Sequence, residues 1–153
     1  MKRLGLLFTF LMIIVFSCKT TQQASLKEFG SPNVEHSLIN DNTFQITQFS
    51  KDKTYGYEQL NPIMVGGVKN MEGPLNQRRF LNALAGPNGE EIGYYRVGSC
   101  CHFKTKNSTF GGTGLLDIYN VFYEGLQEPI ELYLNMYDSD TLRVPVGFTL
   151  KNL

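Results

Sequence analysis

The sequence lacks an apolar run long enough to cross a bilayer. A membrane-spanning helix needs roughly 20 consecutive apolar residues, and the longest run here, Leu4 to Phe16, has 13. The run follows Met1-Lys2-Arg3 and precedes Ser17-Cys18, the order of a cationic segment, an apolar segment and a cleavage site in exported proteins. Residues 1–17 are therefore predicted to be a lipoprotein signal peptide, and Cys18 is predicted to carry acyl chains such as palmitate.

The chain also lacks an excess of charge of either sign. It has 14 basic and 14 acidic residues, and removal of Lys2 and Arg3 with the signal leaves 12 basic residues and a net charge near −2. The remaining bases are scattered, without the basic stripe and interleaved aromatic residues that bind phosphate backbones. Nucleic acid is excluded as a partner, and membrane attachment is expected to depend on the acyl chains of Cys18.

Cysteine and histidine are scarce, with three and two copies. If Cys18 carries lipid, the other two cysteines stand together in Cys100-Cys101-His102. Three interpretations remain open. An even cysteine count in an oxidising compartment favours a disulfide between neighbours. A metal site is disfavoured because adjacent residues rarely point at one ion. Structural or intermolecular thiols at a strand end are the third interpretation and the preferred one, because cysteine is so often simply buried.

A catalytic use of the same tripeptide is also disfavoured. A nucleophilic set of Cys101, His102 and Asp117 can be imagined, but neighbours on a strand point to opposite faces. A thiol pair made reactive by Arg96 and His102 remains the alternative, since nearby positive charge lowers a thiol pKa. No metal site and no cofactor is predicted.

The composition predicts one domain behind a tether. Residues 18–42 are mostly polar with few large apolar side chains, which is typical of a flexible segment. Residues 43–153 carry the apolar pattern of a globular domain, large enough for a single core.

The domain is predicted to be α+β, with one helix packed on one antiparallel sheet of five or six strands. Pro74 suits a first helical turn and Gly86-Pro87 a stop, so the helix is expected over residues 74–85. The segments expected to be strands begin near Phe44 and continue at 61–65, 92–97, 115–123, 130–137 and 142–150. The last two alternate with period two, and Asp138–Thr141 is interpreted as their hairpin turn.

Two surface sites are suggested by this pattern. Tyr119, Tyr133 and Tyr137 would form an aromatic platform for an envelope protein or glycan if they share an outward face. Aromatic pairs also stabilise sheets without any ligand, and that interpretation is preferred. Thr141, in the tripeptide Asp140-Thr141-Leu142, fits a bacterial O-glycosylation signal.

A family resemblance rests on five segments, which are TYGYEQLNPIMVGG (54–67), GPLNQRRFLNALAGPNG (73–89), YRVGSCC (95–101), GLLD (114–117) and LYLNMYD (132–138). Together they resemble a family of small bacteroidete lipoproteins, over about Thr54 to Lys151. Its members are often labelled 2-dehydro-3-deoxyphosphooctonate aldolase. The resemblance implies an envelope location and, through that label, aldolase activity as one alternative. In such lipoproteins acidic residues after the lipidated cysteine favour surface display; Lys19–Gln23 has none, which favours the periplasmic face of the outer membrane.

The function predicted from these observations is a lipid-anchored periplasmic protein that binds a partner without catalysis. It is favoured because the sequence has no spaced acid, base, nucleophile or metal set. The alternative from the residues themselves is a small thiol or redox protein that uses Cys100 and Cys101.

Overall fold

The computed structural model describes residues 27–30 and 32–152. The predicted signal peptide, residues 1–17, and the predicted lipidation site, Cys18, lie outside these residues. The described part of the chain is an α+β structure, as the sequence pattern predicts.

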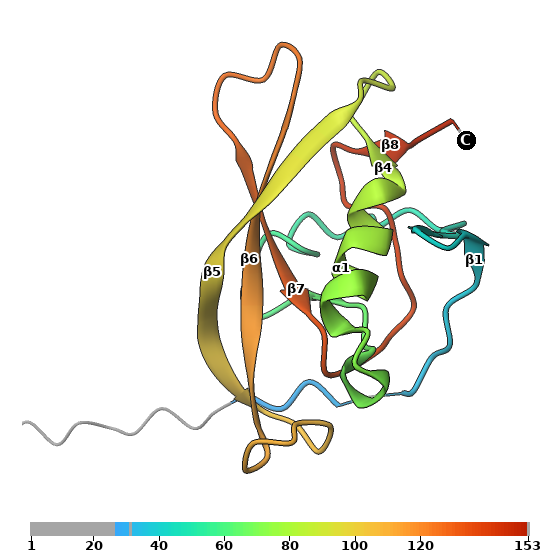
Figure 1. Cartoon of the computed structure of the whole chain (residues 1–153). Coiled ribbons are helices and arrows are strands. Elements are labelled where there is room, and N and C mark those ends of the chain that lie inside the picture. Colours follow the sequence, from blue (N-terminus) through green and yellow to red (C-terminus); the bar gives the residue numbers. More distant parts are fainter. Residues whose placement is uncertain (1–26, 31, 153) are drawn as a thin grey trace, which may run out of the picture.

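The main sheet has four strands in the order β3-β7-β6-β5 (Figure 1). Strands β5 (Ile92–Lys104), β6 (Thr113–Tyr123) and β7 (Ile130–Asn135) follow one another as an antiparallel meander. Strand β3 (Ile63–Met64) pairs with β7 in the parallel direction. The sheet is therefore mixed, with β5 at one edge.

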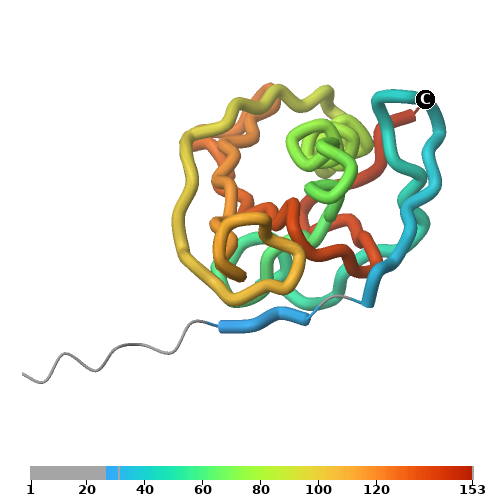
Figure 2. The backbone as a smooth tube through the Cα atoms, turned by 60° about the horizontal axis from the view of Figure 1, so that its bottom comes forward, coloured from blue at the N-terminus to red at the C-terminus, as the bar shows by residue number. Residues whose placement is uncertain are grey.

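One helix packs on the concave face of this sheet. Helix α1 (Gly73–Asn82) follows a short 3-10 helix, η1 (Val68–Asn70), and has proline in its first turn, where the missing N–H costs nothing. Its Phe80 and Leu81 are fully buried in the core cluster that also contains Val121, Leu132 and Leu134 of the sheet. Figure 2 shows α1 inside the curve that the main sheet makes. Among the described residues, no helix is long and apolar enough to cross a membrane.

Two small sheets complete the structure. Strands β1 (Leu38–Asn40) and β2 (Thr43–Phe44) form an antiparallel pair, and α1 lies between this pair and the main sheet (Figures 1 and 2). Strands β4 (Leu84–Ala85) and β8 (Thr149–Leu150) form the second antiparallel pair just after the helix. The single core lies between the main sheet, the helix and these covering segments.

The expectation of one antiparallel sheet of five or six strands is wrong in two respects. The strands divide among three sheets, and β3 runs parallel to β7. The predicted hairpin of 130–137 with 142–150 does not form, because β6 and β3 occupy both edges of β7. Pro145, in the middle of the expected strand, has no N–H to donate to a ladder.

The alternation in 142–150 reflects burial and not a strand ladder. Leu142, Val144 and Phe148 reach the core from an irregular segment that joins only single bridges and the short β8. Two tyrosines tie this segment down: the Tyr57 hydroxyl donates to the Val146 carbonyl, and the Tyr55 hydroxyl accepts from the Arg143 N–H at 3.3 Å. Burial raises the pKa of both hydroxyls to about 12, so they stay protonated near neutral pH.

The described part of the predicted tether contacts the domain. The Lys104 N–H donates to the Lys27 carbonyl at 2.7 Å, and the Phe29 ring meets the Phe103 ring edge-on at 5.0 Å between centroids. Further along, β1 pairs with β2. This contact was not expected of a flexible tether. The edge-on packing of Phe29 against Phe103 offsets part of the entropy of ordering the segment, which its polar residues cannot do.

The buried position of Leu134 makes the sheet assignment testable. Its side chain is fully buried in β7 between β3 and β6. We expect Leu134→Ala to lower the free energy of unfolding by about 2–5 kcal/mol through lost burial and a residual cavity. Urea unfolding measures it. Leu60→Ala, at an exposed leucine, is the control and should change stability by less than about 0.5 kcal/mol; equal effects would contradict the sheet.

Candidate functional site

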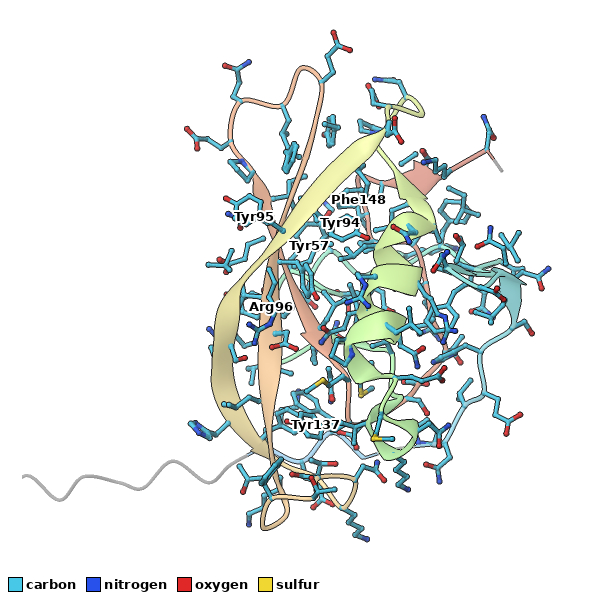
Figure 3. All side chains as sticks on the ribbon, viewed as in Figure 1. Tyr57, Tyr94, Tyr95, Arg96, Tyr137 and Phe148 are labelled. Atoms are coloured by element: carbon cyan, nitrogen blue, oxygen red, sulfur yellow. A yellow bond between two sulfur atoms is a disulfide. The ribbon has the colours of Figure 1, made fainter. Side chains whose placement is uncertain are left out.

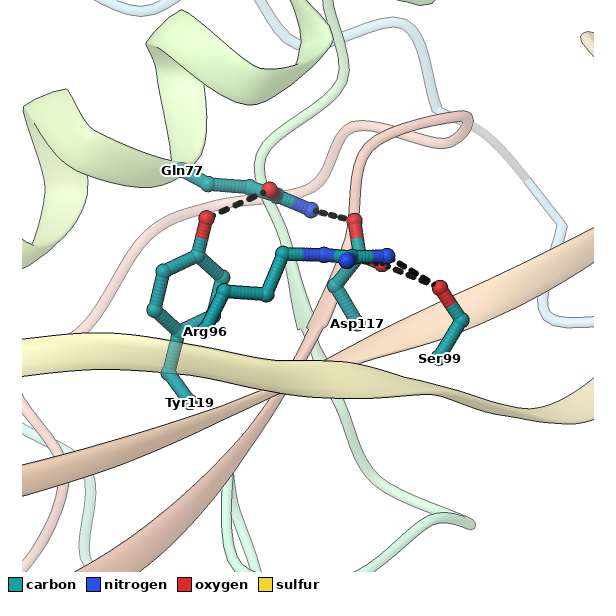
Figure 4. A network of polar contacts seen from close by, with 5 residues as sticks. All are labelled: Gln77, Arg96, Ser99, Asp117 and Tyr119. Carbon is teal, nitrogen blue, oxygen red and sulfur yellow. Dashed lines mark hydrogen bonds and ion pairs between the residues drawn. The ribbon is translucent and has the colours of Figure 1, made fainter.

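A buried carboxylate organises the concave face of the main sheet. Asp117 of β6 is almost fully buried and accepts hydrogen bonds on both oxygens. Gln77 Nε2 donates to Oδ2 at 2.7 Å, and the Ser99 hydroxyl donates to Oδ1 at 2.7 Å. Arg96 donates to Oδ1 through Nε at 3.0 Å and through Nη2 at 2.7 Å. Figure 4 shows these residues with Tyr119; we call the five together the Asp117 network.

A β-bulge brings the two β5 members of the network to one side. Arg96 pairs with Tyr119, whereas Ser99 pairs with Asp117, so three steps along β5 match two along β6. In a regular strand residues three apart face opposite sides. The extra residue between Arg96 and Gly98 removes this conflict, as bulges commonly do when they redirect a side chain. Arg96 and Ser99 therefore both reach the same carboxylate.

The network also joins the sheet to the helix. Tyr119 donates its hydroxyl proton to Gln77 Oε1 at 3.0 Å, and Gln77 is fully buried on α1. Burial, and then the neighbouring carboxylate of Asp117, raise the pKa of Tyr119. Tyr119 thus remains a neutral hydrogen-bond donor at physiological pH. The order of donors and acceptors from Tyr119 through Gln77 to Asp117 is fixed.

The hydrogen bonds and the ion pair of the network balance the charge of Asp117. The Asp117 charge is balanced by Arg96, whose guanidinium is half exposed at the sheet edge. The Ser99 hydroxyl directs its proton at that carboxylate and receives a bond from Arg96 Nη2. Every named polar group is engaged within the network. It therefore locks β5, β6 and α1 together.

Next along β5, Cys100 and Cys101 are joined by a disulfide. A second bulge lies here, since Cys100 pairs with Leu116 and Phe103 with Gly114. Cys101 has φ of 60°, in the left-handed region that residues with a Cβ seldom adopt. The bridge is half-exposed. Of the three interpretations left open by the sequence, the structure contains the vicinal disulfide.

The imagined set of Cys101, His102 and Asp117 is not assembled. Cys101 is bonded to Cys100, and His102 is exposed on β5. The hydrogen bonds of Asp117 in the described structure go to Gln77, Arg96 and Ser99. Because Cys101 is oxidised and the partners of Asp117 do not include His102, the described residues do not form the nucleophilic arrangement.

The condition for a platform of Tyr119, Tyr133 and Tyr137, a shared outward face, is not met. Tyr119 is buried on the concave face, whereas Tyr133 pairs with Ile118 and lies on the opposite, outer face. Tyr137 follows the end of β7 and packs edge-on against Phe103, 5.9 Å between centroids. The strand register explains the separation. Tyr133 pairs with Ile118, and Tyr119 is the next residue on β6, so its side chain points to the other face.

A different aromatic surface is exposed on the outer face of β5 and β6. Tyr95 is 52% exposed and Phe122 is 46% exposed, and their rings contact at 6.3 Å between centroids. Asn120 Nδ2 donates to the Tyr95 hydroxyl at 3.0 Å. Gly93 pairs with Phe122, and a Cβ there would lie 2.4 Å from the ring. We call Tyr95, Asn120 and Phe122 the outer aromatic face. Figure 3 shows Tyr95 on the side of β5 away from Tyr94 and α1.

The N-terminal segment forms a polar pocket of about 390 Å³ with α1. Arg79 crosses it and binds Asn76 Oδ1 at 2.9 Å, Glu72 at 3.4 Å and the Asp41 carbonyl at 2.9 Å. The His36 ring packs on Phe44, and burial lowers the His36 pKa despite an opposing effect of Asp140. Arg79 is thus occupied in fastening the segment to the helix.

The predicted O-glycosylation site lies in the irregular segment after β7 and not in the expected hairpin turn. Thr141 is half-buried; its N–H bonds to Asp140 Oδ1 at 2.6 Å and its carbonyl accepts from Arg143. Modification of Thr141 stays a prediction.

Sequence reasoning did not identify Gln77 and Ser99. One signal was present, since Asp117 stands among apolar residues of a predicted strand, and a buried carboxylate needs polar partners. The partners could not be named, because Gln77 comes from the helix and because residues 96–101 have no period-two pattern that would reveal the bulge aligning Ser99.

Comparisons with known proteins give no relative. No family model, no curated protein and no solved structure matches this chain.

The Asp117 network predicts that a second substitution restores stability lost by a first one. We expect Arg96→Met to lower the unfolding free energy by about 2 kcal/mol, because it leaves a buried carboxylate without its counter-charge; the half-exposed guanidinium keeps the loss below that of a fully buried pair. Adding Asp117→Asn should restore part of the loss. Denaturant unfolding measures both, with exposed Arg78→Met as the matched control. If the double variant has a lower unfolding free energy than Arg96→Met alone, the unbalanced charge of Asp117 is not the cause of the loss.

The left-handed backbone at Cys101 gives a second prediction. With the bridge removed by Cys100→Ala, Cys101→Gly should be more stable than Cys101→Val by about 1–2 kcal/mol, since glycine adopts positive φ without strain. Thermal unfolding compares them. In the unsubstituted protein, alkylation before reduction should leave residues 100 and 101 unlabelled by peptide mass spectrometry. Free thiols there, with no preference for glycine, would refute the bridge.

Proposed function

We propose that this protein is a lipid-anchored outer-membrane protein that faces the periplasm and binds an envelope protein without catalysing a reaction. The observation that carries the binding role is the outer aromatic face, where two large rings lie side by side in solvent. The lipid anchor is inferred from the signal-like segment that ends at Cys18.

The outer aromatic face has the properties of a contact surface. Aromatic side chains are enriched at protein interfaces, because they bury a large area at little cost in rotamer entropy. Here Asn120 already orients Tyr95, and Gly93 leaves room for the Phe122 ring to lie flat. A surface ordered before binding loses less entropy on association.

The position of this face at a sheet edge favours a protein partner over a glycan. β5 is an edge strand, and Ile92–Arg96 pairs regularly with β6 before the first bulge. An edge strand offers main-chain hydrogen-bonding groups to an added strand of another chain. The Asp117 network begins at Arg96, so the stretch that would receive the partner is held against α1 through its neighbours.

The vicinal disulfide supports a second candidate function, a thiol redox protein. Cys100 and Cys101 are half-exposed and lie beside the Asp117 network. Unchanged partner capture and cell phenotype in a Cys100→Ser/Cys101→Ser variant would exclude this candidate. The aldolase activity implied by resemblance is not proposed, because that reaction belongs to (β/α)₈ barrels of roughly 250 residues, and this α+β structure is built around a four-stranded mixed sheet.

Site-specific photo-crosslinking tests the proposed function. A crosslinking amino acid at Tyr95 in the full chain, expressed in its own envelope, should capture one protein, whereas the same group at exposed Arg78 on α1 should not. Tyr95→Ala with Phe122→Ala should weaken partner capture about tenfold, which corresponds to 1.4 kcal/mol, with little change in melting temperature.

Three results would oppose this. Equal capture at Tyr95 and Arg78 would refute the outer aromatic face as the contact surface. Capture of a glycan would refute a protein as the partner. Retention of a Cys18→Ser variant in the membrane fraction would refute the proposal that lipid on Cys18 anchors the protein.

A further inference from the structure

The two ends of the main sheet differ in charge. One end carries the turns 86–91 and 124–129; the other carries the turn 105–112, the start of α1 and residues 27–30, where the described chain begins (Figures 1 and 2). At the first end lie Glu90, Glu91, Glu124 and Glu128, with Lys151 paired to Glu91 at 3.0 Å. This end is acidic. We call the second one the N-terminal end.

The N-terminal end is rich in lysine. Lys69 and Lys106 line one pocket of about 320 Å³, and Lys104 is joined to Lys27 through a backbone hydrogen bond. All four lysines are exposed. Glu28 and the buried Asp138 line the same pocket and offset two of these charges. Positive charge nevertheless exceeds negative charge here, while the reverse holds at the acidic end.

The same end exposes two large apolar side chains. Met71 is 93% exposed, just before α1, and Phe110 is 80% exposed, in the turn between β5 and β6. They are the most exposed large apolar side chains of the described residues. Single exposed apolar residues are ordinary. Two of them beside four lysines, at one end of a molecule, form the pattern of an interfacial membrane contact.

The length of chain before residue 27 brings this end close to the membrane. Eight residues separate Cys18 from Lys27. An extended chain covers at most about 3.6 Å per residue, so the nine steps from Cys18 to Lys27 span no more than about 32 Å. If Cys18 is lipidated, as the proposed function holds, the N-terminal end is confined near the headgroups, where a weak contact becomes populated through high effective concentration.

We propose that the N-terminal end docks on the bilayer. Phe110 and Met71 enter the headgroup region, and Lys69, Lys104 and Lys106 contact lipid phosphates. The acidic end then faces away from the anionic surface, and the outer aromatic face stands at the side of the molecule, open to a partner. This inference rests on the proposed lipid anchor and adds an orientation to it.

The absence of tryptophan makes this orientation measurable. The chain contains none, so Phe110→Trp introduces a single fluorescent reporter. The full lipidated protein would be reconstituted in vesicles of phosphatidylethanolamine and phosphatidylglycerol that include brominated phospholipid, which quenches tryptophan by contact. We expect at least about twofold loss of emission and a blue shift. Phe122→Trp, the matched control toward the acidic end, should keep its emission.

Charge reversal tests the lysine contribution. Lys69→Glu with Lys106→Glu in the Phe110→Trp protein should abolish most of the quenching, while vesicle flotation still recovers the protein through its lipid. If Phe110→Trp does not fold, Met71→Trp supplies the reporter at the same end.

The outcomes separate the two proposals. A protein that floats with vesicles but whose Trp at position 110 is not quenched refutes docking and leaves the anchor standing. A full-length protein that does not float, and behaves like Cys18→Ser, refutes the anchor instead. Equal quenching at positions 110 and 122 would refute the orientation.

Discussion

The buried charge of Asp117 is the constraint on which the arrangement of this domain depends. A carboxylate out of contact with water must be matched by donors and counter-charge, or the folded state loses several kcal/mol. Here the donors come from α1 and from both sides of a bulge in β5. The helix position, the strand register and the bulge are therefore coupled, because each supplies one partner that the others cannot replace.

This coupling gives the two surfaces a fixed relation. The outer aromatic face lies on the opposite side of the same strands, immediately before the first bulge of β5. The N-terminal end lies beyond the second bulge. The network holds β5 to the helix between them. A partner bound near Tyr95 and a bilayer bound near Phe110 would thus act on one rigid body. The proposed anchor would set the distance of the outer aromatic face from the bilayer and its orientation.

Local sequence patterns predicted the elements better than their pairing. The helix expected at 74–85 is observed at Gly73–Asn82, and the strands expected at 115–123 and 130–137 correspond to β6 and β7. Proline, glycine and period-two apolar residues are local signals, so they identify such elements. They do not state which strand lies beside which, and the parallel pairing of β3 with β7 followed from no pattern. The Asp117 network escaped prediction because residues 96–101, where the bulge lies, have no period-two apolar pattern in which a one-residue shift could be seen.

The ring of Phe122 rests where Gly93 has no side chain, and a Cβ at that position would lie 2.4 Å from the ring. The shape of the proposed contact surface is therefore set partly by an empty volume on a neighbouring strand. A residue that offers no side chain to any partner would then shape the surface that the partner meets. Glycine at this position is therefore a more specific requirement of the proposed contact surface than either aromatic residue alone, since rings on sheets also serve packing.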